Sequence, residues 1–225
     1  MYAINHAATA LLFKKKAAKS PMWTLLVSVQ LVEILWVIFN YLGWEHFSVS
    51  NGNLHLDFLP YSHSIFSGVA WALLSFAIII LVSKDRKLGI AFSLGVVSHI
   101  VIDLLFHEKD ILLSPFSKTP VWGLGIIDYP WLDFFLELIY GIFCWCYFKG
   151  SKALLAVIVV FNLTDLPMML AHGTSLEPFR QYPAILPSVI LFQIFITWYF
   201  VWRFSKRASY SKQQPTKQAE LRQQL

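Results

Sequence analysis

Long runs of apolar residues, separated by short polar stretches, dominate the chain. Crossing a hydrocarbon layer of ~30 Å takes about 20 helical residues, and each run has roughly that length. None of the runs shows the alternation of apolar and polar residues that is typical of barrel strands, so all are expected to be helices. The six expected spans are Met22–Trp44, His63–Val82, Leu88–Leu105, Trp131–Phe148, Ala153–Leu170 and Pro183–Phe204.

The composition indicates an integral membrane protein. Of the 225 residues, 57% are hydrophobic and 14% are charged, whereas soluble domains carry about 25% charged residues. The sequence therefore predicts an all-α, polytopic membrane bundle in which residues 1–204 form a single membrane domain. Residues 205–225 have too little apolar content to fold alone and are expected to be a disordered, polar tail. Membrane lipids are the expected partners, and the sequence does not determine the oligomeric state.

Connecting segments rich in basic residues alternate along the chain with segments that hold few. The net charge of +5 comes from Lys and Arg gathered in these segments and in the tail, which argues against a nucleic-acid-binding protein. By the positive-inside rule, both termini are expected to be cytoplasmic, and segments 45–62, 106–130 and 171–182 are expected to face outward. The outward segments hold only three basic residues, Lys109, Lys118 and Arg180.

The N-terminal stretch Tyr2–Phe13 is apolar but too short to cross the membrane before the lysines at 14–16. The expected fold includes it as a half-inserted helix, since about 13 helical residues reach some 20 Å and would lift His6 toward the middle of the bilayer. The alternative is a helix that lies on the inner surface. The length of the stretch alone does not separate the two.

Ionisable residues inside the expected spans lie mainly in the outer half of the membrane. A charged side chain at a helix centre costs about 2.5–3.5 kcal/mol on insertion scales, so a shared depth indicates a common polar cavity. His99 and Asp103 are four residues apart, on one helical face, where both could bind one cation. Glu33 and His63 should reach the same depth from other helices, and imidazole with carboxylate is a zinc-type ligand set. The ordinary alternative for His99 and Asp103 is hydrogen bonding to neighbouring helices.

Other polar residues have weaker grounds for a functional role. Glu137 faces the same half of the membrane, where it could accept a proton during catalysis or simply be a neutral or paired acid. Asp165 lies close to Pro167 and is expected to support the helix there. Three further polar residues are expected at the outer end of the bundle, where contact with solvent is the ordinary reason for a charged side chain: His46, Asp57 and His107.

Four short motifs occur in a familiar order: Asn5-His6-Ala7-Ala8-Thr9, Val32-Glu33, Ser62-His63-Ser64, and Ser98-His99 with Asp103. Through them, residues 1–150 resemble the membrane-bound metal-dependent hydrolase family of bacterial inner-membrane proteins. The resemblance implies a divalent metal, zinc most readily, and places the chain in the inner membrane. It also implies a recurring acid at Glu137 and the ligand set His6, Glu33, His63, His99 and Asp103. Three features depart from the family pattern: Glu33 replaces the usual Asp, Val32 replaces the Pro before it, and the Asp-x-Asp-His extension of some members is missing.

Two functions fit this pattern. The first is a metal-dependent hydrolase that acts on an ester or phosphoester in a lipid, with Glu137 as the proton acceptor. The second is a small cation- or proton-coupled transporter that uses the same histidines and carboxylates. The confinement of the polar residues to one half of the membrane, with no visible internal repeat, favours the hydrolase.

Overall fold

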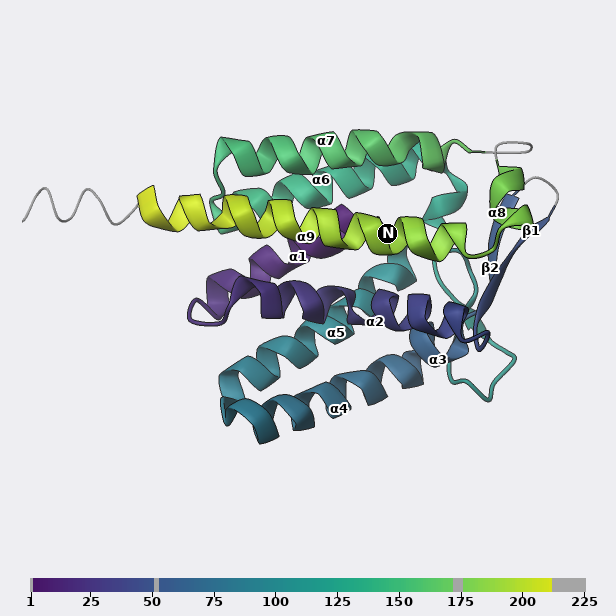
Figure 1. The fold of residues 1–225 in the computed structure, drawn as a ribbon, viewed down its shortest axis with the longest axis horizontal. Helices are drawn as coiled ribbons and strands as arrows, with labels where there is room; N and C mark the ends of the chain where they lie inside the picture. The colour runs from purple at the N-terminus through teal and green to yellow at the C-terminus, as the bar shows by residue number, and fades with distance from the viewer. Residues whose placement is uncertain (1, 51–52, 172–175, 212–225) are drawn as a thin grey trace, which may run out of the picture.

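Six long apolar helices form the body of the molecule in the computed structural model, which describes residues 2–50, 53–171 and 176–211. Each is long and apolar enough to cross a membrane. The predicted all-α bundle with six spans is therefore confirmed for the described residues. The helices, shown in Figure 1, are α2 Met22–Tyr41, α4 Ile65–Ser83, α5 Arg86–Phe106, α6 Pro130–Phe148, α7 Lys152–Met169 and α9 Ile185–Ser211.

His63 does not begin a spanning helix as expected. It ends the short helix α3, Pro60–His63, and α4 starts only at Ile65. Ser64 separates the two helices: its backbone is extended, and its side chain accepts a hydrogen bond from the backbone N–H of Ser67 at 3.2 Å. A serine in this position satisfies one of the free amide groups at a helix start, so it fixes the beginning of α4 locally. The break places His63 at the end of α3, ahead of the spanning helix α4.

The last helix is longer than the apolar pattern predicted. It continues past Phe204 to Ser211, so the expected boundary between the membrane domain and the tail falls inside α9. The rest of the expected tail, residues 212–225, lies outside the described residues.

The first helix, α1 (Ala3–Lys16), lies inside the bundle, where it contacts α2, α5, α6, α7 and α9. Several of its apolar side chains, such as Ile4 and Leu11, are fully buried. Gly141 of α6 permits a close approach, because a Cβ atom there would lie 2.7 Å from Asn5 Oδ1. These contacts agree with the half-inserted alternative and not with a helix on the membrane surface.

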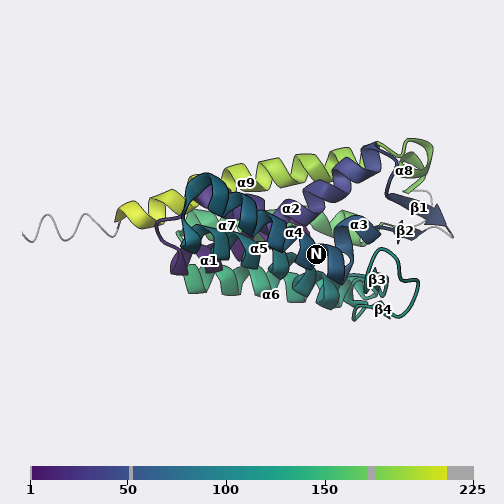
Figure 2. The same cartoon turned by 90° about the horizontal axis from the view of Figure 1, so that it is seen from below.

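Two short antiparallel hairpins were not among the expected elements. Segment 45–62 does contain a sequence signal for a hairpin: the dipeptide Asn51-Gly52, which lies between residues that alternate in polarity. We call the end of the bundle that carries the hairpins, α3 and α8 (Glu177–Gln181) the hairpin end, and the opposite end, with Lys14–Lys16, the basic end (Figures 1 and 2). The strands are β1 His46–Ser50 with β2 Asn53–Phe58, and β3 Ile111–Leu112 with β4 Val121–Trp122.

Candidate metal centre

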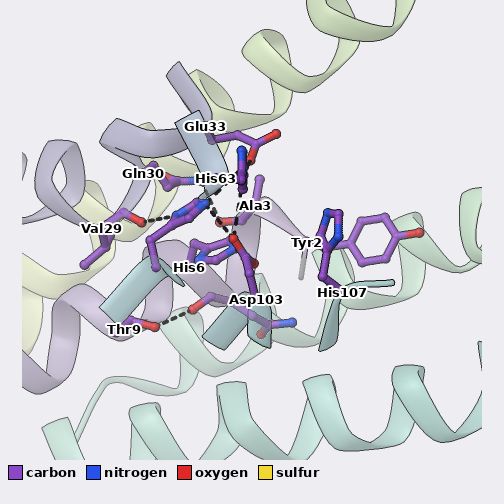
Figure 3. A network of polar contacts seen from close by, with 12 residues as sticks. Tyr2, Ala3, His6, Thr9, Val29, Gln30, Glu33, His63, Asp103 and His107 are labelled. Carbon is purple, nitrogen blue, oxygen red and sulfur yellow. Dashed lines mark hydrogen bonds and ion pairs between the residues drawn. The ribbon is translucent and has the colours of Figure 1, made fainter. Parts of the chain in front are cut away.

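Five side chains meet in one polar cluster inside the bundle, and they are the five ligands expected from the sequence (Figure 3). Four helices contribute to it: α1 supplies His6, α2 supplies Glu33, α3 supplies His63, and α5 supplies His99 and Asp103. The cluster therefore depends on the insertion of α1 and on the break before α4, because these two features bring His6 and His63 to the spanning helices.

Four donor atoms lie at the centre of the cluster: Glu33 Oε2, His63 Nε2, His99 Nε2 and Asp103 Oδ2. His63 Nε2 lies 3.4 Å from the Glu33 oxygen and 3.7 Å from the Asp103 oxygen. His99 Nε2 lies 3.6 Å and 3.1 Å from the same two oxygens. In a tetrahedral zinc site with bonds of about 2.0–2.1 Å, ligand atoms lie about 3.3 Å apart. The four separations between nitrogen and oxygen lie around that value, and the donors form two overlapping groups with metal-ligand spacing that share His99: Glu33, His63 and His99, and His6, His99 and Asp103.

His99 presents an acceptor nitrogen to the cluster. Its Nδ1 lies 2.8 Å from the carbonyl oxygen of Val29. A carbonyl can only accept, so Nδ1 carries the proton, and if the ring is neutral its Nε2 has a free lone pair for a metal. His99 is fully buried, and its Nε2 has no hydrogen-bond partner among the described residues. A buried ring nitrogen that faces two carboxylate oxygens, with the other ring nitrogen held by a backbone carbonyl, is an arrangement typical of a metal-ligating histidine.

His63 is oriented by a chain of two hydrogen bonds. Ser62 Oγ donates to Glu45 Oε2 at 2.6 Å and lies 2.7 Å from His63 Nδ1. Because the single hydroxyl proton goes to Glu45, the serine oxygen accepts from Nδ1, and His63 Nε2 is left as a ligand atom. Burial raises the pKa of Glu45, while hydrogen bonds from Ser62 favour its charged form. The sequence did not identify Ser62 and Glu45 as supporting residues, although Ser62 belongs to the Ser-His-Ser motif.

His6 lies beside the four central donor atoms. Its Nε2 is 3.3 Å from Asp103 Oδ1, the carboxylate oxygen that faces away from the other two histidines. The ring stacks on His99, with centroids 3.9 Å apart. His6, His99 and Asp103 also form a second group with metal-ligand spacing. His6 can therefore orient Asp103 or provide a further ligand.

The cluster is almost sealed from solvent. Two buried carboxylates with neutral imidazoles carry two negative charges, and such charges are costly unless a cation compensates them. One divalent ion would balance them. Glu33 marks the side on which the cluster is accessible, as the exposed fractions of the side chains show: 3% for His6, 22% for Glu33, 4% for His63, 0% for His99 and 2% for Asp103.

Glu137 contacts α1 in the structure. Its carboxylate accepts hydrogen bonds from the backbone N–H of Tyr2 at 3.1 and 3.2 Å and from Asn5 Nδ2 at 2.6 Å. Asn5 also donates to Asn162 on α7 at 2.8 Å. Glu137 thus helps to fix the start of α1, next to His6. Its expected role as a proton acceptor stays a prediction.

The remaining sequence candidates lie outside the cluster. Asp165 accepts a hydrogen bond from Gln193 Nε2 at 2.9 Å, so it links α7 to α9. His107 Nδ1 lies 2.9 Å from Asp110 Oδ1, and its ring centroid is 6.0 Å from that of His63. His46 is exposed on β1. Of Asp57, only the backbone is described, as part of β2.

The fold and the cluster define a class: a multi-pass helical membrane protein with buried histidines and carboxylates at the junction of four helices. Residues 60–175 match the YdjM inner membrane protein family. This match covers more than half of the chain, which belongs to that family and is a multi-pass inner-membrane protein. His63, His99, Asp103 and Glu137 lie in the matched part, whereas Glu33 precedes it. No curated protein and no solved structure matches the chain.

Proposed function

We propose that the cluster binds one divalent metal ion, zinc most readily, and that the protein uses it to hydrolyse an ester or phosphoester in a lipid-linked substrate. The observation that carries the proposal is the arrangement of two imidazole nitrogens and two carboxylate oxygens with separations of 3.1–3.7 Å. Imidazole and carboxylate are the ligands of many catalytic zinc sites. The resemblance to membrane-bound metal-dependent hydrolases supports the same chemistry.

The chain's own residues hold the two ligand rings in place. The Val29 carbonyl fixes the tautomer of His99, and Ser62 fixes that of His63. Such contacts behind the ligands orient the rings and raise their basicity. A divalent ion held by these residues would lower the pKa of a bound water toward neutrality. Glu33 is the most exposed of the five side chains, so substrate would approach on its side.

The proton acceptor in this proposal is Glu137. Its hydrogen bonds to Tyr2 and Asn5 support a second role, in which it acts as an anchor that positions α1 and therefore His6. The two roles differ in what the loss of the charge would do. A base outside the ligand set affects the rate, whereas an anchor affects metal binding and stability.

The orientation in the membrane is also part of the proposal. We place both termini in the cytoplasm and the hairpin end on the outer side of the inner membrane. The distribution of basic residues supports this orientation, because the outward segments hold only Lys109, Lys118 and Arg180. The cluster would then be reached from the outer leaflet or the space beyond it.

A cation- or proton-coupled transporter is the second candidate. Separations of 3.1–3.7 Å also suit protonated imidazoles that form ion pairs with Glu33 and Asp103. In that case the cluster would hold protons instead of a metal. Metal analysis therefore separates the two candidates.

The test is metal content and lipid hydrolysis of the purified full-length protein. We expect about one divalent ion per chain in the wild type. The His63→Ala and Asp103→Ala variants should lose both the ion and the release of product from a phospholipid, whereas His46→Ala, a matched change at an exposed histidine, should retain both. A wild type that stays free of metal after incubation with zinc or manganese would remove the hydrolase proposal and leave the transporter.

A further inference from the structure

A second polar cavity lies at the hairpin end of the bundle. Its volume is about 560 Å³, within the range of roughly 300–1,000 Å³ that is typical of small-molecule sites. The residues around it come from β2, from the segment that follows α5, and from β4. The polar side chains that line it are His55, Glu108, Lys109, Asp110, Ser117 and Lys118.

The charges around this cavity are only partly compensated. Glu108 Oε2 lies 3.7 Å from His55 Nδ1, and Asp110 Oδ1 lies 2.9 Å from His107 Nδ1. Both acids therefore have a partner. Lys109 and Lys118 are exposed, and neither forms an ion pair with any carboxylate in the part of the chain that the structure describes. The cavity thus offers two ammonium groups to an incoming ligand.

These two lysines stand out in the charge distribution of the chain. The segments at the hairpin end contain three basic residues, and two of the three line this one cavity. The other basic residues of the chain belong to the basic end and the C-terminal segment. The cavity therefore combines two lysines that form no ion pair among the described residues with two acids, Glu108 and Asp110, that lie against histidines, so its ammonium groups are available to an anionic ligand.

One residue connects the cavity with the candidate metal centre. The His107 ring lies 6.0 Å from the ring of His63, and its Nδ1 contacts Asp110, which lines the cavity. Backbone hydrogen bonds from Leu124 to the Leu104 carbonyl and from Gly125 to the His107 carbonyl hold this segment against the end of α5. The cavity is therefore linked to the His63 side of the metal centre through Asp110 and His107.

We propose that this cavity binds a phosphate group through Lys109 and Lys118. Phosphate matches two ammonium groups better than a neutral ligand does, because charge-assisted hydrogen bonds to its oxygens are the strong ones. The link to the metal centre makes the phosphate part of the substrate, a step that rests on the proposed hydrolase function. The group could belong to a phospholipid headgroup or to a soluble phosphate compound.

The experiment measures phosphate binding by the full-length protein in nanodiscs. In one arm, radiolabelled inorganic phosphate is dialysed to equilibrium against protein in phosphatidylcholine nanodiscs. In the other arm, native mass spectrometry compares the retention of phosphatidic acid with that of phosphatidylcholine. The paired variant Lys109→Gln/Lys118→Gln is compared with Lys84→Gln/Lys87→Gln, which removes the same charge at the basic end, where Lys84 follows α4 and Lys87 lies in the first turn of α5.

We expect saturable binding in at least one arm, weakened by about tenfold or more in Lys109→Gln/Lys118→Gln and unchanged in the control. The arm that responds identifies the source of the phosphate. Absence of binding in both arms, or equal binding by the cavity variant and the wild type, overturns the proposal. Measuring every protein with and without chelator separates this result from the metal proposal, because the lysines would still bind phosphate in metal-free protein.

Discussion

The imidazole of His6 stacks on that of His99, with ring centroids 3.9 Å apart and planes inclined by 12°. The two residues belong to α1 and α5, which lie far apart in the chain. The stack places His6 Nε2 against the outer oxygen of Asp103, at 3.3 Å. The position of α1 in the bundle therefore controls the geometry of an acid that also faces His63 and His99.

Removing the charge of Glu33 should weaken metal binding. Glu33→Gln keeps the size of the side chain but removes one of the two negative charges that balance the ion, so we expect a loss of affinity of roughly 10²-fold or more. The affinity is measured from the metal content after dialysis against a chelator of known affinity. Asp165→Asn is the control, because Asp165 contacts Gln193 and not the cluster. If Asp165→Asn strips the ion while Glu33→Gln does not, the ligands lie elsewhere.

The Ser62 hydroxyl should contribute to metal affinity without touching the ion. Ser62→Ala removes the acceptor for His63 Nδ1, and the loss of such a contact typically lowers affinity by about 10–100-fold. Competition with a fluorescent zinc chelator measures the change. Ser64→Ala is a matched control in the same motif: it removes the cap of α4 and should cost about 1 kcal/mol of stability at unchanged affinity. Equal effects on affinity in both variants would contradict the orienting role.

Glu137→Gln should distinguish a base from an anchor. If Glu137 accepts the proton, the variant keeps its metal and loses about 10²–10⁴-fold in rate. If Glu137 anchors α1, the variant loses stability and metal affinity, and Asn5→Ala should reproduce this effect because Asn5 donates to the same carboxylate. Turnover, metal content and thermal unfolding of the two variants are measured together. A variant at full activity, metal content and stability would exclude both roles.

The orientation predicts which engineered cysteines react with an impermeant reagent. We expect a cysteine at Thr119, exposed at the hairpin end, to be labelled in intact cells. A cysteine at Lys19, exposed at the basic end, should react only after the membrane is permeabilised. Cys146→Ser provides the background, because Cys146 is the exposed native cysteine. Labelling in the opposite order would invert the orientation and place the candidate site on the cytoplasmic side.

The sequence alone determined the six spans. Each span is an apolar segment of the chain. In lipid, such a segment can satisfy its backbone hydrogen bonds only as a helix. The position and the helical form of each span therefore do not depend on contacts with distant residues. The resemblance also named the five residues of the cluster, from His6 to Asp103. Most helix ends were predicted to within a few residues. The end of α9 was not, because the helix continues past Phe204 to Ser211.

Only the tertiary structure decided how these residues meet. The length of Tyr2–Phe13 allowed a surface helix or an inserted one, and the choice came from packing against five other helices, with Gly141 leaving room for Asn5. The tautomers of His63 and His99 depend on Ser62 and on the Val29 carbonyl, partners that no spacing in the sequence reveals. Spans follow from the local free energy of transfer into lipid, whereas the site follows from contacts between segments far apart in the chain. The sequence therefore determined which side chains could bind a metal, and the packing of α1, α2, α3 and α5 determined that they face one another.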